Sequence, residues 1–261
     1  MIRSLYTGTT GMNSQQLNID VISNNLANVS TTGFKKSINT FQDLLYETLT
    51  VPGSPTSAET QSPTGIQVGL GVRPASVTKI FSQGELIGTE NELDVAIDGQ
   101  GFFQVELPDG DTAYTRAGAF KLDSTGTIVN SNGYTVLPAL TIPQGSNRIN
   151  ISETGVVSAV LAGETDATEI GNLELALFIN AAGLSSTGDN LLVETTASGP
   201  PAIGEPGDEG YGVLIQTFLE GSNVNIVQEL TNLITAQRAY EINSKSIQTS
   251  DEMMQTTNQL V

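Results

Sequence analysis

The sequence predicts an α+β protein in which long N- and C-terminal helices form a coiled-coil-like layer and a central stretch forms an antiparallel β-rich domain. Apolar residues recur at every seventh position near both ends of the chain. Between these ends, short apolar or alternating runs are separated by Gly, Asp and Asn turn residues. We expect the helices within residues 1–33 and 222–261, an extended linker over 34–80 with a loop near 46–65, and the β-rich domain over 81–221.

The N-terminal helix is predicted from its apolar spacing. Between Ser4 and Phe34 the only charged residue is Asp20, and amides and hydroxyls fill the remaining faces. A helix in free contact with water usually carries more charge, so we expect this helix to pack against protein surfaces. The apolar residues expected to mediate that packing are Leu5, Met12, Ile19, Ile22, Leu26 and Val29.

The C-terminal helix shows the most regular spacing in the chain. Its heptad repeat favours coiled-coil-like packing, although Gln237, Ser244 and Asp251 interrupt the positions that would complete the apolar seam. An ordinary helix packed on its own domain is the alternative. Because no third helical segment completes a bundle, we expect both stripes to bind each other and neighbouring subunits. The expected assembly residues of this helix are Ile226, Leu230, Leu233, Tyr240, Ile247 and Met254.

The central region is predicted to form strands joined by tight turns. Turn chemistry is present at Asp98-Gly99, at 108–110, at 123–126 and at 131–133. Predicted strands lie at 148–152, 156–161, 173–179, 191–195 and 213–219, in addition to those within 92–105 and 114–136. An antiparallel β-domain is the simplest fold for this pattern.

Composition excludes several classes of function. The chain has no Cys, His or Trp, so thiol and imidazole catalysts and the common transition-metal ligands are absent. The net charge of -18 would repel nucleic acid. We find neither an apolar run of about 18 residues that could span a membrane nor a cleavable signal peptide.

No residue pattern predicts catalysis or a cofactor. Paired carboxylates such as Asp94 with Asp98, or Asp109 with Asp111, could serve a glycosidase, but most of them flank glycines at predicted turns. The Gly99-Gln-Gly101 segment does not continue into a nucleotide-binding glycine motif. The 108–111 segment lacks the ligand spacing of a calcium loop. We therefore predict a protein that is not an enzyme, with no cofactor and no metal.

Five ordered segments resemble the bacterial flagellar rod and hook family. They are 24–35 (NNLANVSTTGFK), 93–105 (LDVAIDGQGFFQV), 114–120 (YTRAGAF), 221–225 (GSNVN) and 236–245 (AQRAYEINSK). The segments 1–5, 44–46, 71–74 and 82–84 are most similar to the distal-rod members of that family. The residues that carry the family motifs are Asn24, Asn25, Leu26, Ala27, Asn28, Gly33, Phe34, Asp98, Gly99, Gly101, Phe102, Phe103, Gln237, Arg238, Ala239, Tyr240 and Glu241.

The resemblance implies a structural subunit of the distal rod in the flagellar basal body. Such a subunit forms a helical homopolymer, a rigid hollow drive shaft that crosses the periplasm and outer-membrane region, transmits torque from motor to hook and allows export through its channel. It also implies type III export without a cleaved signal peptide, contacts with proximal rod and hook subunits and with the surrounding bushing rings, and a stiffening role for 40–72. Another axial subunit (proximal rod or hook) and a secreted β-rich binding module remain as alternatives, and a carbohydrate-cleaving enzyme is more remote.

Overall fold

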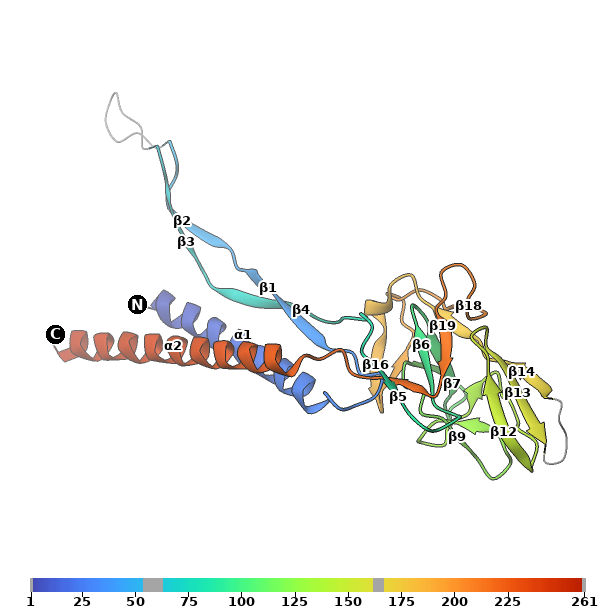
Figure 1. Cartoon of the computed structure of the whole chain (residues 1–261). Helices are drawn as coiled ribbons and strands as arrows, with labels where there is room; N and C mark the ends of the chain where they lie inside the picture. Colours follow the sequence, from blue (N-terminus) through green and yellow to red (C-terminus); the bar gives the residue numbers. More distant parts are fainter. Residues whose placement is uncertain (1, 54–62, 162–166, 260–261) are drawn as a thin grey trace. The chain divides into compact units, whose positions relative to one another are not determined.

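The computed structural model describes residues 2–53, 63–161 and 167–259, which form two compact units (Figure 1). The helical unit comprises Met1–Ala27, Ser37–Thr78 and Asn225–Val261. The β-unit comprises Asn28–Lys36 and Lys79–Val224. The chain therefore passes between the units four times. The predicted α+β class, with terminal helices in contact and a central antiparallel region, is confirmed.

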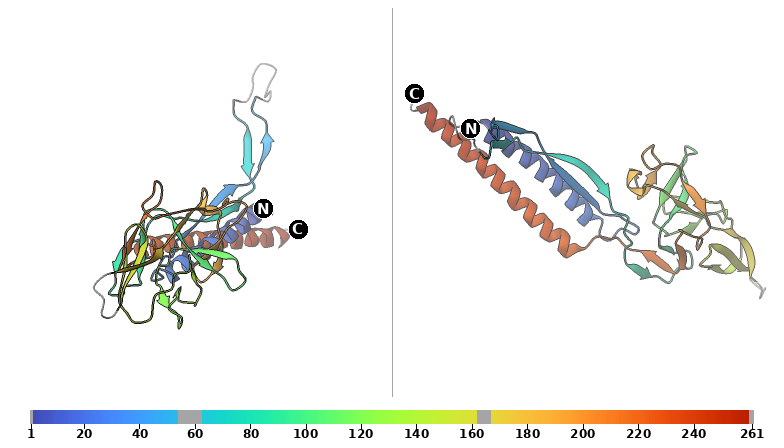
Figure 2. Two further views of the ribbon diagram at one scale, coloured as in Figure 1. Left: turned by 90° about the vertical axis from the view of Figure 1, so that its right-hand side faces the viewer. Right: turned by 90° about the horizontal axis from the view of Figure 1, so that it is seen from above.

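The helical unit is built on α1 (Ile2–Ala27) and α2 (Ile226–Gln259), which run side by side in opposite directions (Figure 2). Helix α1 ends at Ala27, before the expected packing residue Val29, and α2 begins at Ile226. After α1, the Thr31 amide and hydroxyl turn back onto the carbonyl and side chain of Asn28, so Val29 lies outside the helix. Before α2, the Asn225 side chain accepts a hydrogen bond from the Gln228 amide and caps the helix.

The segment predicted as an extended linker is a paired β-ribbon. Strand β1 (Ser37–Asp43) pairs with β4 (Val72–Lys79), and β2 (Tyr46–Thr50) pairs antiparallel with β3 (Ile66–Gly69). Backbone hydrogen bonds from Leu44 to Gly71 and from Leu70 to Leu45 connect the two ladders. Residues 46–50 of the predicted loop at 46–65 are thus strand, and its residues 54–62 lie outside the described residues.

The β-unit contains antiparallel sheets, and its described strands include a seven-stranded sheet in the order β16-β17-β8-β7-β15-β18, with β11 also beside β7. These are β16 (Ser185–Gly188), β17 (Leu191–Val193), β8 (Thr112–Thr115), β7 (Phe102–Glu106), β15 (Leu175–Leu177), β18 (Ala202–Gly204) and β11 (Val136–Leu137). A three-stranded sheet contains β12 (Ser146–Ile151), β13 (Val156–Leu161) and β14 (Thr168–Asn172). The two-stranded pairs are β6 (Val95–Asp98) with β19 (Val213–Gln216), β5 (Leu86–Gly88) with β20 (Phe218–Glu220), and β9 (Lys121–Leu122) with β10 (Ile128–Val129).

The core of the β-unit lies where these sheets meet, and it is formed by the apolar runs seen in the sequence. Phe103 and Phe120 pack edge to face with ring centroids 5.0 Å apart, and Val95, Ile97 and Leu175 are fully buried in the same cluster. The predicted strand at 213–219 is divided in two, because Thr217 adopts a positive φ of 64°. The strands β14, β16 and β18 were not predicted, because they are short, polar or rich in small residues.

A buried phenol makes the stability of the β-unit sensitive to alkali. Burial raises the pKa of Tyr114, and the negative charge of Glu194 raises it further. The unfolded phenol therefore ionises first, at about pH 10, and the free energy of unfolding should fall as pH rises above that value. We expect Tyr114→Phe to flatten this loss in urea titrations followed by circular dichroism between pH 8 and 11. Lys35 has a lowered pKa and the opposite pH dependence, but it is present in both chains and cancels in the comparison. Identical pH profiles would contradict the assignment.

Candidate functional site

The seam between α1 and α2 is formed by small and polar residues. On α2 the buried positions are Glu229, Ala236 and Ser250, which follow a seven-residue spacing. The two helices meet along a ladder of antiparallel pairs: Ser4 with Ser250, Gly8 with Ile247, Gly11 with Asn243 and Asn25 with Glu229. A seam of this kind buries little apolar surface. It therefore fixes the register of the two helices but adds little to their stability.

Two glycines of α1 allow the helices to approach closely. A Cβ atom added to Gly8 would lie 2.9 Å from Cγ1 of Ile247, and one added to Gly11 would lie 2.9 Å from the Asn243 side chain. Contacts this short require the neighbouring side chain to move. The seam therefore depends on the absence of a side chain at both positions.

Asn25 joins three elements of the helical unit and is almost fully buried. Its side-chain amide donates to the Ser37 carbonyl at 2.8 Å, and its Oδ1 accepts from the Ser37 amide at 2.9 Å. It also donates to Glu229 Oε2 at 3.5 Å. This family-motif residue thus fixes the start of the ribbon against both helices, a role that its polar character alone did not reveal.

Of the predicted heptad residues, Ile247 contacts Gly8 in the seam, and many of the others remain partly open. On α1, Ile22 is buried, while Leu5, Met12, Ile19 and Leu26 are half-buried; Val29 is half-buried in the β-unit. On α2, Leu233, Ile247 and Met254 are half-buried, whereas Ile226, Leu230 and Tyr240 are exposed.

A second apolar row on α2 was missed in the sequence. Val227, Ile234, Ile242 and Met253 are 74, 50, 69 and 53% exposed. Since successive helical residues are about 100° apart, Val227 and Ile234 lie on the side of α2 opposite the seam, whereas Ile242 lies about 100° from Asn243 and Met253 about 60° from Ser250. The sequence signal for this row was the spacing of seven, eight and eleven residues between its successive members, which the stronger heptad repeat obscured. We call these four residues the outer apolar row.

The β-ribbon also exposes apolar side chains. Leu45, Tyr46, Leu49, Val51 and Ile66 are all exposed. Arg3 of α1 forms an ion pair with Glu47 of β2 at 2.5 Å, but both side chains are nearly half exposed, so the pair contributes little stability. A two-stranded ribbon with apolar residues in water is marginal by itself and gains from being covered.

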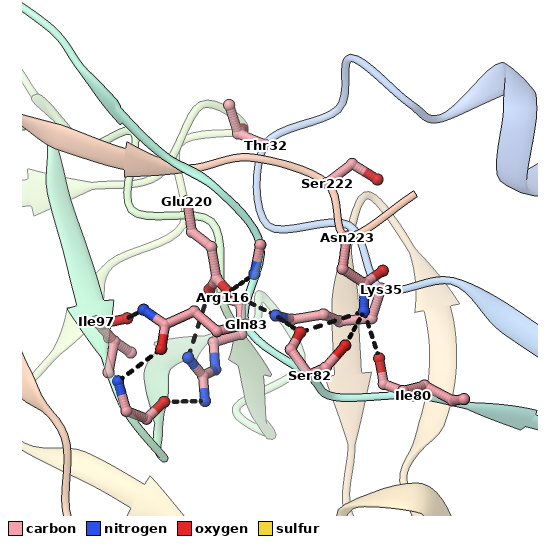
Figure 3. Close-up of polar contacts among 12 residues, drawn as sticks. Thr32, Lys35, Ile80, Ser82, Gln83, Ile97, Arg116, Glu220, Ser222 and Asn223 are labelled. Atoms are coloured by element: carbon pink, nitrogen blue, oxygen red, sulfur yellow. Dashed lines mark hydrogen bonds and ion pairs between the residues drawn. The ribbon is translucent and has the colours of Figure 1, made fainter. Parts of the chain in front are cut away.

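Charged side chains meet inside the β-unit in the arrangement shown in Figure 3. The Glu220 side chain is 0% exposed; its Oε1 lies 2.5 Å from Lys35 Nζ, and its Oε2 lies 3.4 Å from an Arg116 guanidinium nitrogen. Lys35 also donates to the Ser82 carbonyl and Arg116 to the Gly99 carbonyl, both at 2.8 Å. Burial lowers the pKa of Lys35 and of Arg116, and Glu220 opposes both shifts.

Asn223 extends this polar cluster. Its Oδ1 accepts from the Lys36 amide at 2.8 Å, and its Nδ2 donates to the Ile80 carbonyl at 2.8 Å and to the Ser82 carbonyl at 3.2 Å. We call Lys35, Arg116, Glu220 and Asn223 the junction clasp. Sequence analysis singled out none of the four as a site residue, because their partners are distant in the chain.

The remaining family-motif residues divide between core and surface. Gly33 and Phe34 are buried in the β-unit, and the Lys79 amine lies 5.1 Å from the Phe34 ring centroid. Phe102, Phe103 and Gly101 are buried, whereas Asp98, the last residue of β6, and Gly99 after it are exposed. On α2, Gln237, Arg238, Tyr240 and Glu241 are exposed and Ala239 is half-buried. Asn24 and Ala27 are exposed on α1, and Asn28 is half-buried in the β-unit.

The described residues offer no arrangement suited to catalysis. Within 2–53, 63–161 and 167–259 no group of three or more acidic residues is placed to hold a metal ion. A polar hollow in the β-unit is lined by Asn28, Thr32, Asn130, Asn190 and neighbouring residues, and among its lining residues Asp189 alone is charged. A membrane-spanning helix is likewise not found in the part of the chain that the structure describes.

Comparisons with known proteins match both helices and part of the β-unit to flagellar rod and hook families. Three family models match: "Flagella basal body rod protein" over residues 5–35, "Flagellar hook protein FlgE/F/G D1 domain" over 96–159, and "Flagellar basal body rod FlgEFG protein C-terminal" over 215–260.

Individual relatives extend the match over the full chain. The flagellar basal-body rod protein FlgG of Buchnera aphidicola subsp. Schizaphis graminum is 52% identical over 260 residues, covering 100% of both chains. The protein of the same name from Bacillus subtilis is 44% identical and covers 98% of this chain and 97% of its own. The flagellar hook protein FlgE of Helicobacter mustelae is 43% identical, but over 52% of this chain and 30% of its own length.

Proposed function

Because this chain belongs to the FlgG family of flagellar basal-body rod proteins, we propose that it polymerises through its terminal helices into the hollow distal shaft of the rod. It is a structural subunit of the flagellar basal-body rod and not an enzyme. Its work is then mechanical, namely to carry torque from the motor toward the hook while leaving a channel for export.

The outer apolar row of α2 is the observation that best supports assembly. One side of α2 faces α1, while Val227 and Ile234 on the opposite side, and Ile242 and Met253 between the two sides, are exposed apolar side chains. Full burial of such a side chain contributes about 1.5–3 kcal/mol, so a neighbouring subunit that covers the row supplies what the α1–α2 seam does not. The exposed heptad residues Ile226, Leu230 and Tyr240 add to the apolar surface of α2 that a neighbouring subunit could cover.

The proposal extends to partners and to export. Proximal rod subunits, hook subunits and the surrounding bushing rings are the expected neighbours of a distal shaft, and type III export without a cleaved signal is its expected route. The ribbon, with Leu45, Leu49 and Ile66 exposed, is suited to contacts between subunits. The alternative of a hook subunit is disfavoured because the hook relative matches only about half of this chain, whereas the rod relatives match all of it. A β-rich binding module is disfavoured for the same reason.

Electron microscopy of the purified full-length chain tests the proposal. We expect straight hollow tubes under polymerising conditions, because the terminal helices can then bury their apolar rows. A variant lacking Ile226–Val261 should form no tubes, while its β-unit stays folded because Asn223 and Glu220 are retained. Compact particles from the full-length chain under every condition that polymerises a rod relative would contradict the proposal.

A further inference from the structure

Three of the four connections between the two units adjoin residues that the junction clasp binds, namely Lys36, Ile80 and Asn223 itself. The chain changes unit between residues 27 and 28, 36 and 37, 78 and 79, and 224 and 225. Within the β-unit these connections belong to three segments, 28–36, 79–84 and 220–224. Any force that reaches the β-unit along the covalent chain therefore enters through one of these three segments.

We propose that the junction clasp couples these three segments, so that none of them can separate from the β-unit without the others. The use of this device in transmitting torque rests on the proposed function, but the coupling itself is a property of the single chain. Its carriers are the buried carboxylate of Glu220 and the more exposed amide side chain of Asn223, and they link each segment to both of the others.

Glu220 is the centre of the coupling. Its Oε1 accepts from Lys35 Nζ in the first segment at 2.5 Å and from the Gly84 amide in the second at 2.9 Å. Its own carbonyl accepts from the Gly33 amide at 2.7 Å. One residue of the third segment is thus bonded to both other segments.

Asn223 duplicates this pattern three residues later. It binds the Lys36 amide of the first segment, and the Ile80 and Ser82 carbonyls of the second. Its backbone amide also donates to the Phe34 carbonyl at 3.4 Å. Lys35 links the first segment directly to the second, because it donates to the Ser82 carbonyl as well as to Glu220.

Burial makes this network cooperative. Two cations share one carboxylate in a site from which water is excluded, and Arg116 also lies over the Phe102 ring at 5.3 Å. Opening a contact of Glu220 would leave a charge desolvated and unpaired, which is far more costly than losing a solvated contact. The segments are consequently expected to open together or not at all.

Amide hydrogen exchange of the full-length protein below its polymerisation concentration tests the coupling. The reporters are the amides of Gly33, Lys36, Gly84 and Asn223, which donate within the network. In the parent chain all four should exchange with one common protection factor. In Asn223→Ala the Gly33 and Gly84 amides should exchange roughly 10-fold to 100-fold faster, although neither bonds to Asn223. Acceleration confined to Lys36 and its neighbours would overturn the proposal.

Two further variants separate coupling from general loss of stability. Glu220→Gln keeps the shape of the side chain but removes the shared charge, and it should accelerate the Lys36 amide, which bonds only to Asn223. Val157→Ala weakens the fully buried core of the β-unit away from the network and should leave the four reporters near their parent values. Equal acceleration in Val157→Ala and Asn223→Ala would show global unfolding instead of coupling. If Glu220→Gln fails to fold, the Asn223→Ala comparison still decides. Neither test needs a polymer, so its failure would leave the proposed function untouched.

Discussion

Replacing Gly33 with Ala is expected to lower the free energy of unfolding of the β-unit by about 4 kcal/mol. Gly33 has a φ of +68°, and an added Cβ would lie 2.6 Å from the Ala117 backbone nitrogen and 2.7 Å from the Arg116 carbonyl carbon. These are backbone atoms, which cannot rotate away as a side chain can. The loss therefore combines a left-handed backbone with a steric clash. Native-state hydrogen exchange of the Phe103 and Leu175 amides in the central sheet measures it.

Gly110→Ala is the matched control for this prediction. Gly110 has a similar positive φ of 86°, but no atom lies within 4 Å of an added Cβ. Its substitution should cost only the conformational part, about 1–2 kcal/mol. If the two variants lose the same free energy of unfolding, the close approach of Gly33 to the 116–117 backbone does not contribute to stability. If Gly33→Ala alone collapses the β-unit, the glycine of this family motif is explained by packing in addition to dihedral angle.

The helices show how far a periodic pattern can be interpreted from sequence. Both were predicted from seven-residue spacing, because that spacing reports one face of a helix regardless of its partner. From the sequence, we expected the seam of α2 to be completed four residues after each apolar heptad position, for example at Gln237 and Asp251, but these two residues are exposed. The structure places it three residues after, at Ala236 and Ser250. Positions three and four residues away share a face, and only the partner helix determines which of the two is covered.

The β-unit shows the complementary limit. Apolar alternation was sufficient for the strands around Phe103, whereas Asp98, expected in a tight turn, is the last residue of β6. The junction clasp was beyond sequence reasoning, because Lys35 and Glu220 are 185 positions apart and each resembles an ordinary surface residue. Local patterns report local structure, whereas a buried ion pair is defined by the tertiary fold that removes water from it.

Ile234→Asp combined with Ile242→Asp is expected to abolish tube formation while leaving the monomer folded. Both residues belong to the outer apolar row and are exposed in the single chain, so their substitution costs the monomer little beyond helix propensity. In a polymer the row would be covered, and losing two buried isoleucines costs at least about 3 kcal/mol per subunit. That corresponds to a rise of more than roughly a hundredfold in the critical concentration. Sedimentation of polymer over a concentration series, with circular dichroism of the supernatant, measures both quantities.

Two control variants make the result specific to the apolar row. Gln248→Asp with Gln255→Asp adds the same two charges to exposed polar positions of α2 and should polymerise near the parent concentration. Ile234→Leu with Ile242→Leu keeps the row apolar and should also polymerise. Loss of tubes in the glutamine variant would mean that charge on α2, and not burial of the row, controls assembly. Normal tubes from the isoleucine-to-aspartate variant would mean that this face of α2 stays in water in the polymer, and the contacts between subunits would then fall to the half-open heptad residues beside the seam.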